Sequence, residues 1–208
     1  MRIDLLKTTP DRAGRYWITF EDDTKLALYR QTVEDFGLYT GMELTEGEYE
    51  KLLTAAGAMS AKMRAVRIVS ATNVSRRDLE DRLVRKGEGE EQAKAAVQWL
   101  AELNLVDDRN TARQIVDSCV RKGYGLQRAK QALYEKQIPK DLWEEVLADY
   151  PDQTERIADF LRTQLRDPDD PRQVRRAIDA ALRRGHSYGD VKRALEQIGT
   201  ESEFEEDY

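Results

Sequence analysis

The sequence has one cysteine and one histidine, and these two shortages exclude several classes of protein. Cys119 has no partner for an internal disulfide, and together with His186 it cannot complete a His/Cys metal site. The two residues lie in separate helical segments, so neither a Ser-His-Asp nor a Cys-His catalytic arrangement is expected. A lone cysteine also fits a reducing compartment, and we expect a cytoplasmic protein.

Long apolar runs are missing as well, which argues against a membrane-spanning helix. The opening MRIDLLK is too short and too charged for a signal peptide. Neither a GxxxxGK[ST] loop nor a GxGxxG motif after a strand occurs. Acid pairs such as Asp107-Asp108 and Asp169-Asp170 are more typical of helix caps and turns than of catalytic sites. We therefore expect a protein that is not an enzyme and has no cofactor.

The charge is abundant but unevenly distributed. Charged residues make up 36% of the chain, and the net charge is −6. Five acids crowd into residues 200–208, whereas residues 62–199 hold 27 basic and 24 acidic side chains. A DNA-binding protein that acts alone is normally much more basic than this. The balance favours a partner of mixed charge and at most weak or indirect contact with single-stranded DNA.

Residues 1–60 have a pattern of their own. The segments 15–20 (RYWITF) and 25–29 (KLALY) are rich in β-prone residues and flank a turn-like EDDT, which predicts a hairpin. Residues 3–6 are a candidate third strand. A short helix is expected at 32–36, and a capping box that begins at Thr45 predicts a second helix. Gly57 is a plausible end for that helix.

From Lys62 onward the spacing of apolar residues predicts only helices. Ser75 and Ser187 are typical N-caps, and Pro171 fits the first turn of a helix. The predicted helices after the one at Lys62 are 76–86, 90–103, 110–122, 126–136, 139–147, 152–166, 171–184 and 187–198.

An internal repeat emerges from these helices. The segments that start at Ser75, Gly125 and Ser187 each place apolar residues four and eight positions after a cap-favouring residue. Small three-helix units bury too little apolar surface to be stable alone, so they stack on their neighbours. We expect a mainly α protein in which three tandem three-helix repeats form an elongated, curved body. The predicted segments are 1–60 (β-hairpin and short helices), 61–106, 107–150 and 151–199 (repeats), and 200–208 (acidic tail).

Several segments, in order along nearly the whole chain, resemble the bacterial RecX family. They are KLALY (25–29), GMELT (41–45), LNLVDD (103–108), RKG (121–123), LRRGHSY (182–188) and VKRAL (191–195). Gly89 and Glu90 depart from the family pattern at a helix start, and the acidic tail is a second departure. The resemblance implies a regulator that docks on the filament of RecA recombinase and single-stranded DNA. We expect this regulator to be a monomer. Such a regulator suppresses ATP hydrolysis and strand exchange and tempers the SOS response to DNA damage.

The candidate partner-binding residues are basic and lie near the repeat motifs. They are Arg76, Arg77, Arg121, Lys122, Arg128, Lys130, Arg183, Arg184, Lys192 and Arg193. The pairs Arg121-Lys122 and Arg183-Arg184 recur before a glycine near helix C-termini, where cations also simply offset the helix dipole. The alternative function is direct nucleic-acid binding, because three-helix units with a basic helix resemble helix-turn-helix modules. Steep salt dependence would distinguish it.

Four other side chains are expected to be structural. Trp99 and Trp143 lie on apolar helical stripes and are expected to anchor cores. Cys119 follows Ile115 at helical spacing and is expected to be a buried filler. His186 precedes the Ser187 cap, where an apolar side chain usually packs.

Overall fold

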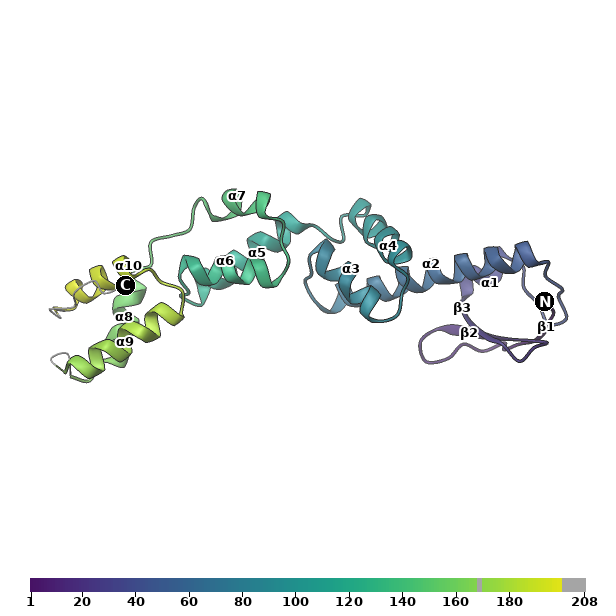
Figure 1. Cartoon of the computed structure of the whole chain (residues 1–208), viewed down its shortest axis with the longest axis horizontal. Coiled ribbons are helices and arrows are strands. Elements are labelled where there is room, and N and C mark those ends of the chain that lie inside the picture. Colours follow the sequence, from purple (N-terminus) through teal and green to yellow (C-terminus); the bar gives the residue numbers. More distant parts are fainter. Residues whose placement is uncertain (168–169, 200–208) are drawn as a thin grey trace. The chain divides into compact units, whose positions relative to one another are not determined.

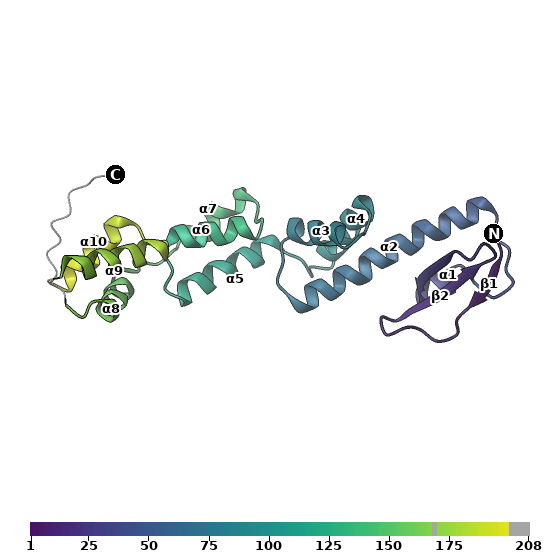
Figure 2. The same ribbon diagram turned by 60° about the horizontal axis from the view of Figure 1, so that its bottom comes forward.

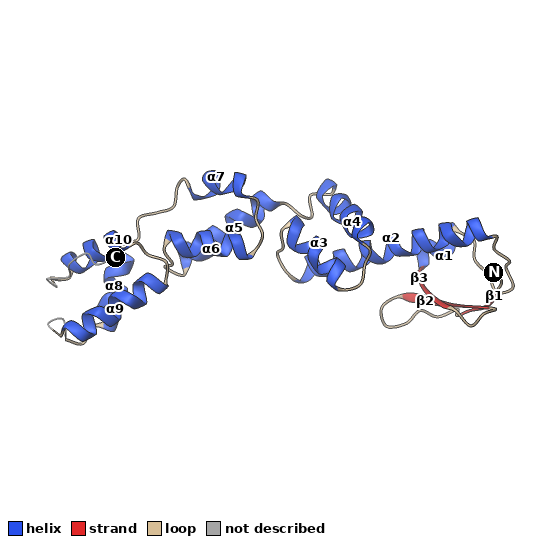
Figure 3. Ribbon diagram, in the orientation of Figure 1, coloured by secondary structure: helices blue, strands red, loops and turns tan. Residues whose placement is uncertain are grey.

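A computed structural model describes residues 1–167 and 170–199, which form two compact parts (Figure 1). The N-terminal part is Met1–Asp107, and the C-terminal part begins at Asp108. Helices predominate in both, and the strands of the described residues all lie in the N-terminal part (Figure 3). The prediction of a mainly α protein with a small N-terminal β element is confirmed. The predicted acidic tail, 200–208, lies outside the described residues.

The β element is a three-stranded antiparallel sheet. Strands β1 (Ile3–Leu6), β2 (Arg15–Phe20) and β3 (Lys25–Tyr29) are ordered β1-β2-β3. The hairpin and the candidate third strand are both confirmed. Alternate side chains of β2, Ile18 and Phe20, are buried on the face that packs on the helices.

Two helices complete this first core. Helix α1 (Arg30–Asp35) is short, and α2 (Glu46–Ala71) lies along the sheet (Figure 2). The predicted capping box is present: Glu48 N donates to Thr45 Oγ1 at 3.3 Å, and Thr45 N donates to Glu48 Oε2 at 2.8 Å. The core consists of Ile3, Ile18, Phe20, Leu28, Leu38, Leu44, Leu52 and Ala56.

The predicted stop at Gly57 is wrong, because α2 continues through it for 26 residues in all. A glycine ends a helix when it takes a left-handed conformation, and Gly57 does not have a positive φ. The interior glycine costs roughly 1 kcal/mol relative to alanine. Packing on both sides offsets that cost, since Ala56 lies in the sheet core and Ala61 in the next core. The same helix therefore crosses the predicted boundary between residues 60 and 61.

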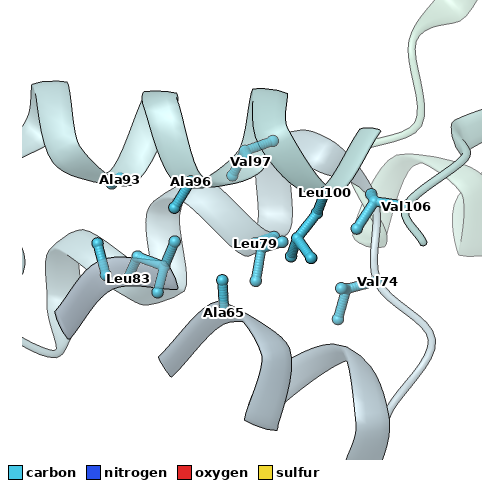
Figure 4. Packing of buried hydrophobic residues seen from close by; sticks show 10 residues of the cluster. Ala65, Val74, Leu79, Leu83, Ala93, Ala96, Val97, Leu100 and Val106 are labelled. Carbon is cyan, nitrogen blue, oxygen red and sulfur yellow. The ribbon is translucent and has the colours of Figure 1, made fainter. Parts of the chain in front are cut away.

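The C-terminal half of α2 forms the first three-helix bundle with α3 (Arg76–Arg85) and α4 (Glu90–Glu102). Ser75 caps α3 as predicted, accepting from Asp78 N at 3.1 Å. At Gly89, where the sequence departs from the family pattern, α4 starts without a side-chain cap. Figure 4 shows Leu79, Leu83 and Leu100 converging on Ala65 of α2. Trp99 is half-buried at the edge of this core, with Lys62 Nζ over its ring.

The C-terminal part contains the second and third bundles. The second holds α5 (Asp108–Arg121), α6 (Leu126–Glu135), a 3-10 turn η1 (Lys140–Leu142) and α7 (Trp143–Leu147). Its core is Ala112, Val116, Leu133 and Ile138, with Trp143 half-buried against it. The third holds α8 (Thr154–Gln164), α9 (Pro171–Arg183) and α10 (Tyr188–Gln197) around a core that includes Ile157, Ile178 and Val191. Pro171 occupies the first turn of α9 as predicted.

The order of the helices corrects the register of the repeat. The segments aligned in the sequence begin α3, α6 and α10, but α3 and α6 are the middle helices of their bundles and α10 is the last. By order, α9 is the counterpart of α3 and α6. A left-handed residue follows each of these helices, at Gly87, Gln137 and Gly185, but Gly199 follows α10 in the same way, so only the order distinguishes α9 from α10. A cap followed by apolar residues at four and eight positions fits any short amphipathic helix, so it does not fix the register.

Candidate partner-binding surface

The second and third bundles meet end to end at α9 and α6. Gly125 N donates to Arg184 O at 2.9 Å, and Gln127 N donates to Gly185 O at 3.1 Å. Free N–H groups at the start of α6 are thus satisfied by carbonyls at the end of α9, so the two helix dipoles run head to tail. We call this contact the bundle junction.

Two glycines make so close an approach feasible. A Cβ atom on Gly125 would lie 2.0 Å from Gly185 O, and one on Gly185 would lie 2.3 Å from Arg128 N. Gly185 also has a φ of 86°, a conformation that residues with a Cβ rarely adopt. Backbone therefore packs directly on backbone at the bundle junction.

Arg184 reinforces the bundle junction with its side chain. Its Nη2 donates to Lys122 O at 2.7 Å, and its guanidinium lies over the rings of Tyr124 (5.3 Å) and Phe160 (4.7 Å). Such stacking binds a cation to the face of an aromatic ring. Its Nε is buried without an acceptor in the described residues. Lys122 and Arg184 are thus brought together, but through the carbonyl of Lys122, and the Arg184 side chain is engaged within the chain.

Two further side chains, those of His186 and Arg156, bond across the two bundles, and Tyr150 bonds within the second bundle to Tyr124. The buried His186 donates from Nε2 to Gly123 O at 3.1 Å, since a carbonyl can only accept. Burial is the main cause that lowers the pKa of His186 below its ordinary value. Tyr150 Oη donates to Tyr124 O at 2.7 Å, and burial raises the pKa of Tyr150 to about 12. Arg156 donates to Val120 O.

Burial settles two of the expectations about single side chains. His186 and Cys119 are both buried, as expected of packed residues. Burial also raises the pKa of the Cys119 thiol, which disfavours the reactive thiolate. The hydrogen bond of His186 to Gly123 was not predictable, because it crosses between two bundles.

The other predicted residues are spread over three bundles. Arg121, Lys122 and Arg183 are exposed beside the bundle junction, and Lys192 is exposed on α10. Two are paired within their own helices: Arg128 with Glu135 at 3.2 Å, and Arg193 with Asp190. Lys130 is half-buried. Arg76 and Arg77 are exposed on α3, in the N-terminal part.

Three exposed arginines of α9 were missed by the sequence reasoning. Arg172, Arg175 and Arg176 lie on the side of α9 opposite its buried residues. The signal was present in PRQVRRAIDAALRR, where arginines alternate with apolar residues at helical spacing. The pattern of a basic pair before a glycine includes only the end of that helix, Arg183 and Arg184.

Comparison with known proteins shows which proteins the chain resembles. A family model described as the second three-helix domain of RecX matches residues 107–147, the second bundle. A regulatory protein RecX of Clostridioides difficile (strain 630) is 27% identical over 98% of this chain and 97% of its own length. Another, from Caldanaerobacter subterraneus subsp. tengcongensis, is 26% identical over 70% of this chain and 74% of its own.

Solved structures share the fold. A crystal structure of regulatory protein RecX matches 94% of this chain and 98% of its own, with a TM-score of 0.67 and 19% identity. That of RecX from Lactobacillus salivarius matches 70% of this chain and 98% of its own, with a TM-score of 0.62 and 20% identity. The relatives are named as regulatory proteins, not as enzymes. In the part of the chain that the structure describes, every helix is too short or too polar to cross a membrane.

Proposed function

We propose that this chain, which belongs to the RecX family of regulatory proteins, binds the filament of RecA recombinase and single-stranded DNA and inhibits it. The observation that carries the proposal is the match to a regulatory protein RecX along nearly the full length of both chains. Inhibition would act on ATP hydrolysis, strand exchange and the coprotease activity that induces the SOS response.

The mechanism we propose is binding, not chemistry. The bundle junction joins the second and third bundles through backbone hydrogen bonds, which gives a binding surface larger than one bundle offers. The exposed cations beside it, Arg121, Lys122 and Arg183, are suited to acidic groups on a filament. A surface that contacts neighbouring recombinase subunits can hold them in an arrangement that does not turn over ATP.

The direct test is ATP hydrolysis by preformed recombinase filaments. The full chain, added at about one molecule to ten or more recombinase subunits, should slow hydrolysis. A substoichiometric effect is expected because one bound regulator blocks the cooperative behaviour of the subunits around it. Hydrolysis that stays unchanged even at equimolar protein would contradict the proposal.

The alternative, direct nucleic-acid binding, makes a different prediction. Binding to DNA alone should weaken steeply with salt, because phosphate contacts release counterions. The regulator we propose should act on the filament at salt concentrations where its binding to DNA alone is weak. The two functions therefore separate when both assays are run at physiological salt.

A further inference from the structure

Helix α9 carries an outward row of arginines that the fold itself does not use. We call Arg172, Arg175, Arg176 and Arg183 the arginine stripe. All four are exposed, and within the described residues none of their guanidinium groups forms an ion pair. The opposite side of the helix is buried in the core of the third bundle and consists of Val174, Ala177, Ile178 and Ala181.

The stripe is straight and narrow. At 3.6 residues per turn, Arg172, Arg176 and Arg183 project within roughly 40° of one another, and Arg175 lies at one edge. The rise from Arg172 to Arg183 is about 16 Å. Asp179 is the one acid on this face, so the stripe keeps a net charge of about +3.

Three other exposed arginines of the C-terminal part form ion pairs with nearby acids. On α8, Arg162 pairs with Asp159 at 2.7 Å, and on α10, Arg193 pairs with Asp190. Arg113 of α5 pairs with Glu145 at 2.8 Å. Ordinary solvated helix faces mix signs in this way. The arginine stripe differs from these three arginines, because its four guanidinium groups form no ion pair within the described residues and only Asp179 lies among them.

The chemistry of the stripe fits phosphate. Guanidinium groups bind phosphate and carboxylate with two parallel hydrogen bonds. A protein partner usually covers an apolar or aromatic centre larger than the single exposed Leu182 that flanks the stripe on α9. Nucleic-acid interfaces are more polar and far more positively charged. A row one side chain wide follows one phosphate backbone, and the exposed Tyr188, five residues after Arg183, offers a ring of the kind on which unpaired bases stack.

We propose that the arginine stripe of α9 binds the phosphate backbone of single-stranded DNA. This goes beyond the proposed function, because the contact requires no recombinase. Since the net charge is small, the binding is weak at physiological salt and strong enough to measure only at low salt. Each phosphate contact to a single strand contributes about −0.7 to the slope of log affinity against log salt. Three or four contacts give a slope of about −2 to −3.

The test uses the full chain and a fluorescent oligothymidylate of about 30 nucleotides, a site long enough for such contacts. Anisotropy is measured between about 25 and 150 mM salt, the range in which phosphate contacts are most sensitive. In the stripe variant, Arg172, Arg175, Arg176 and Arg183 are replaced by Gln, which keeps helix propensity. The control variant replaces four exposed cations of the N-terminal part by Gln and so removes the same charge: Lys7, Arg12, Lys25 and Lys51.

We expect the stripe variant to bind at least about tenfold more weakly at low salt, with the slope reduced by about 2. The control variant should keep the slope, and so should a variant with Lys at all four stripe positions. Circular dichroism checks that the variants are folded. Equal losses in the stripe and control variants would overturn the proposal, as would an unchanged stripe variant or binding to duplex but not to the single strand.

Inhibition of recombinase ATPase is measured with the same variants. Loss of inhibition with unchanged DNA binding would assign the stripe to a protein partner and overturn the proposal. If the wild type binds DNA through the stripe but does not inhibit the recombinase, the proposed function fails and this inference stands.

Discussion

Arg183 and Arg184 are neighbours in the sequence but lie in different environments. Arg183 points to solvent, whereas Arg184 is half-buried between Tyr124 and Phe160 and bonds to Lys122 O. Helix α9 ends at Arg183, and Arg184 is its C-cap. Because successive helical residues project about 100° apart, one step along the chain separates a surface cation from a structural one. Their adjacency in the sequence therefore does not imply a shared role.

Replacing Arg184 by Ala should lower the free energy of unfolding by about 2 kcal/mol, because a charged hydrogen bond and two ring contacts are lost together. Replacing Arg183 by Ala should change it by less than about 0.5 kcal/mol, as is usual for an exposed residue. Urea denaturation followed by circular dichroism measures both. Equal effects of the two substitutions would contradict the bridging role of Arg184.

His186 should make stability depend on pH below neutrality. Its folded-state pKa is lowered, mainly by burial, so the unfolded chain takes up a proton before the folded one does. Stability is therefore complete above the unfolded pKa of about 6.5 and falls as the pH drops through it. Urea denaturation at about pH 7.5 and 5.5 checks this, with the His186→Gln variant as reference. A pH dependence of the same size in that variant would rule out His186 as its source.

Two glycines show how an element constrains its residues. Gly57 lies inside α2 without a positive φ, and a Cβ there would meet Gln92 Cγ at an ordinary 3.7 Å. Gly185 ends α9 with a positive φ and touches the backbone of Arg128. The same residue type is dispensable in one place and required in the other.

Gly57→Ala should therefore raise the free energy of unfolding by about 0.5 to 1 kcal/mol, since alanine loses less backbone entropy in a helix. Gly185→Ala should lower it by more than about 1 kcal/mol, because the new side chain meets both strain and a clash. Thermal or urea unfolding gives both values. A destabilising Gly57→Ala would mean that α2 breaks at this position in solution.

For the molecule as a whole, we expect the exposed charges to affect partner binding more than stability. Arg121, Lys122 and Arg183 are exposed near helix C-termini, where the helix dipole favours cations. Reversing these three to Glu should cost about 0.3–1 kcal/mol each and leave the chain folded. Arg184 is excluded from this set because its loss would disturb the bundle junction.

The triple reversal should weaken inhibition of recombinase ATPase at least about tenfold, because opposed charge at an interface affects association strongly. A matched variant with Lys51, Lys94 and Lys140 changed to Glu should inhibit like the wild type. Circular dichroism confirms that both are folded. If the folded triple variant inhibits as well as the wild type, the three cations do not contact the partner and only compensate the helix dipole.

By itself the sequence determined the local features of this protein. Thr45, Ser75 and Pro171 set helix starts, and alternation set the strands, because caps and periodicity depend on residues a few positions apart. The resemblance to the RecX family rested on short segments in order along the chain, and the match to a regulatory protein RecX over 98% of this chain confirms it. The cap and strand signals are each contained within one turn or one strand.

The tertiary structure alone decided what depends on distant residues. The continuation of α2 through Gly57 rests on cores on either side of that residue, and the register of the repeat rests on which helices share a core. Arg184 became a structural residue because Tyr124 and Lys122, some sixty positions earlier, lie against it. An arginine or a glycine has the same intrinsic propensities wherever it occurs in the sequence. Only the packing around it decides whether an arginine is a surface charge or joins two bundles, and whether a glycine is tolerated or required.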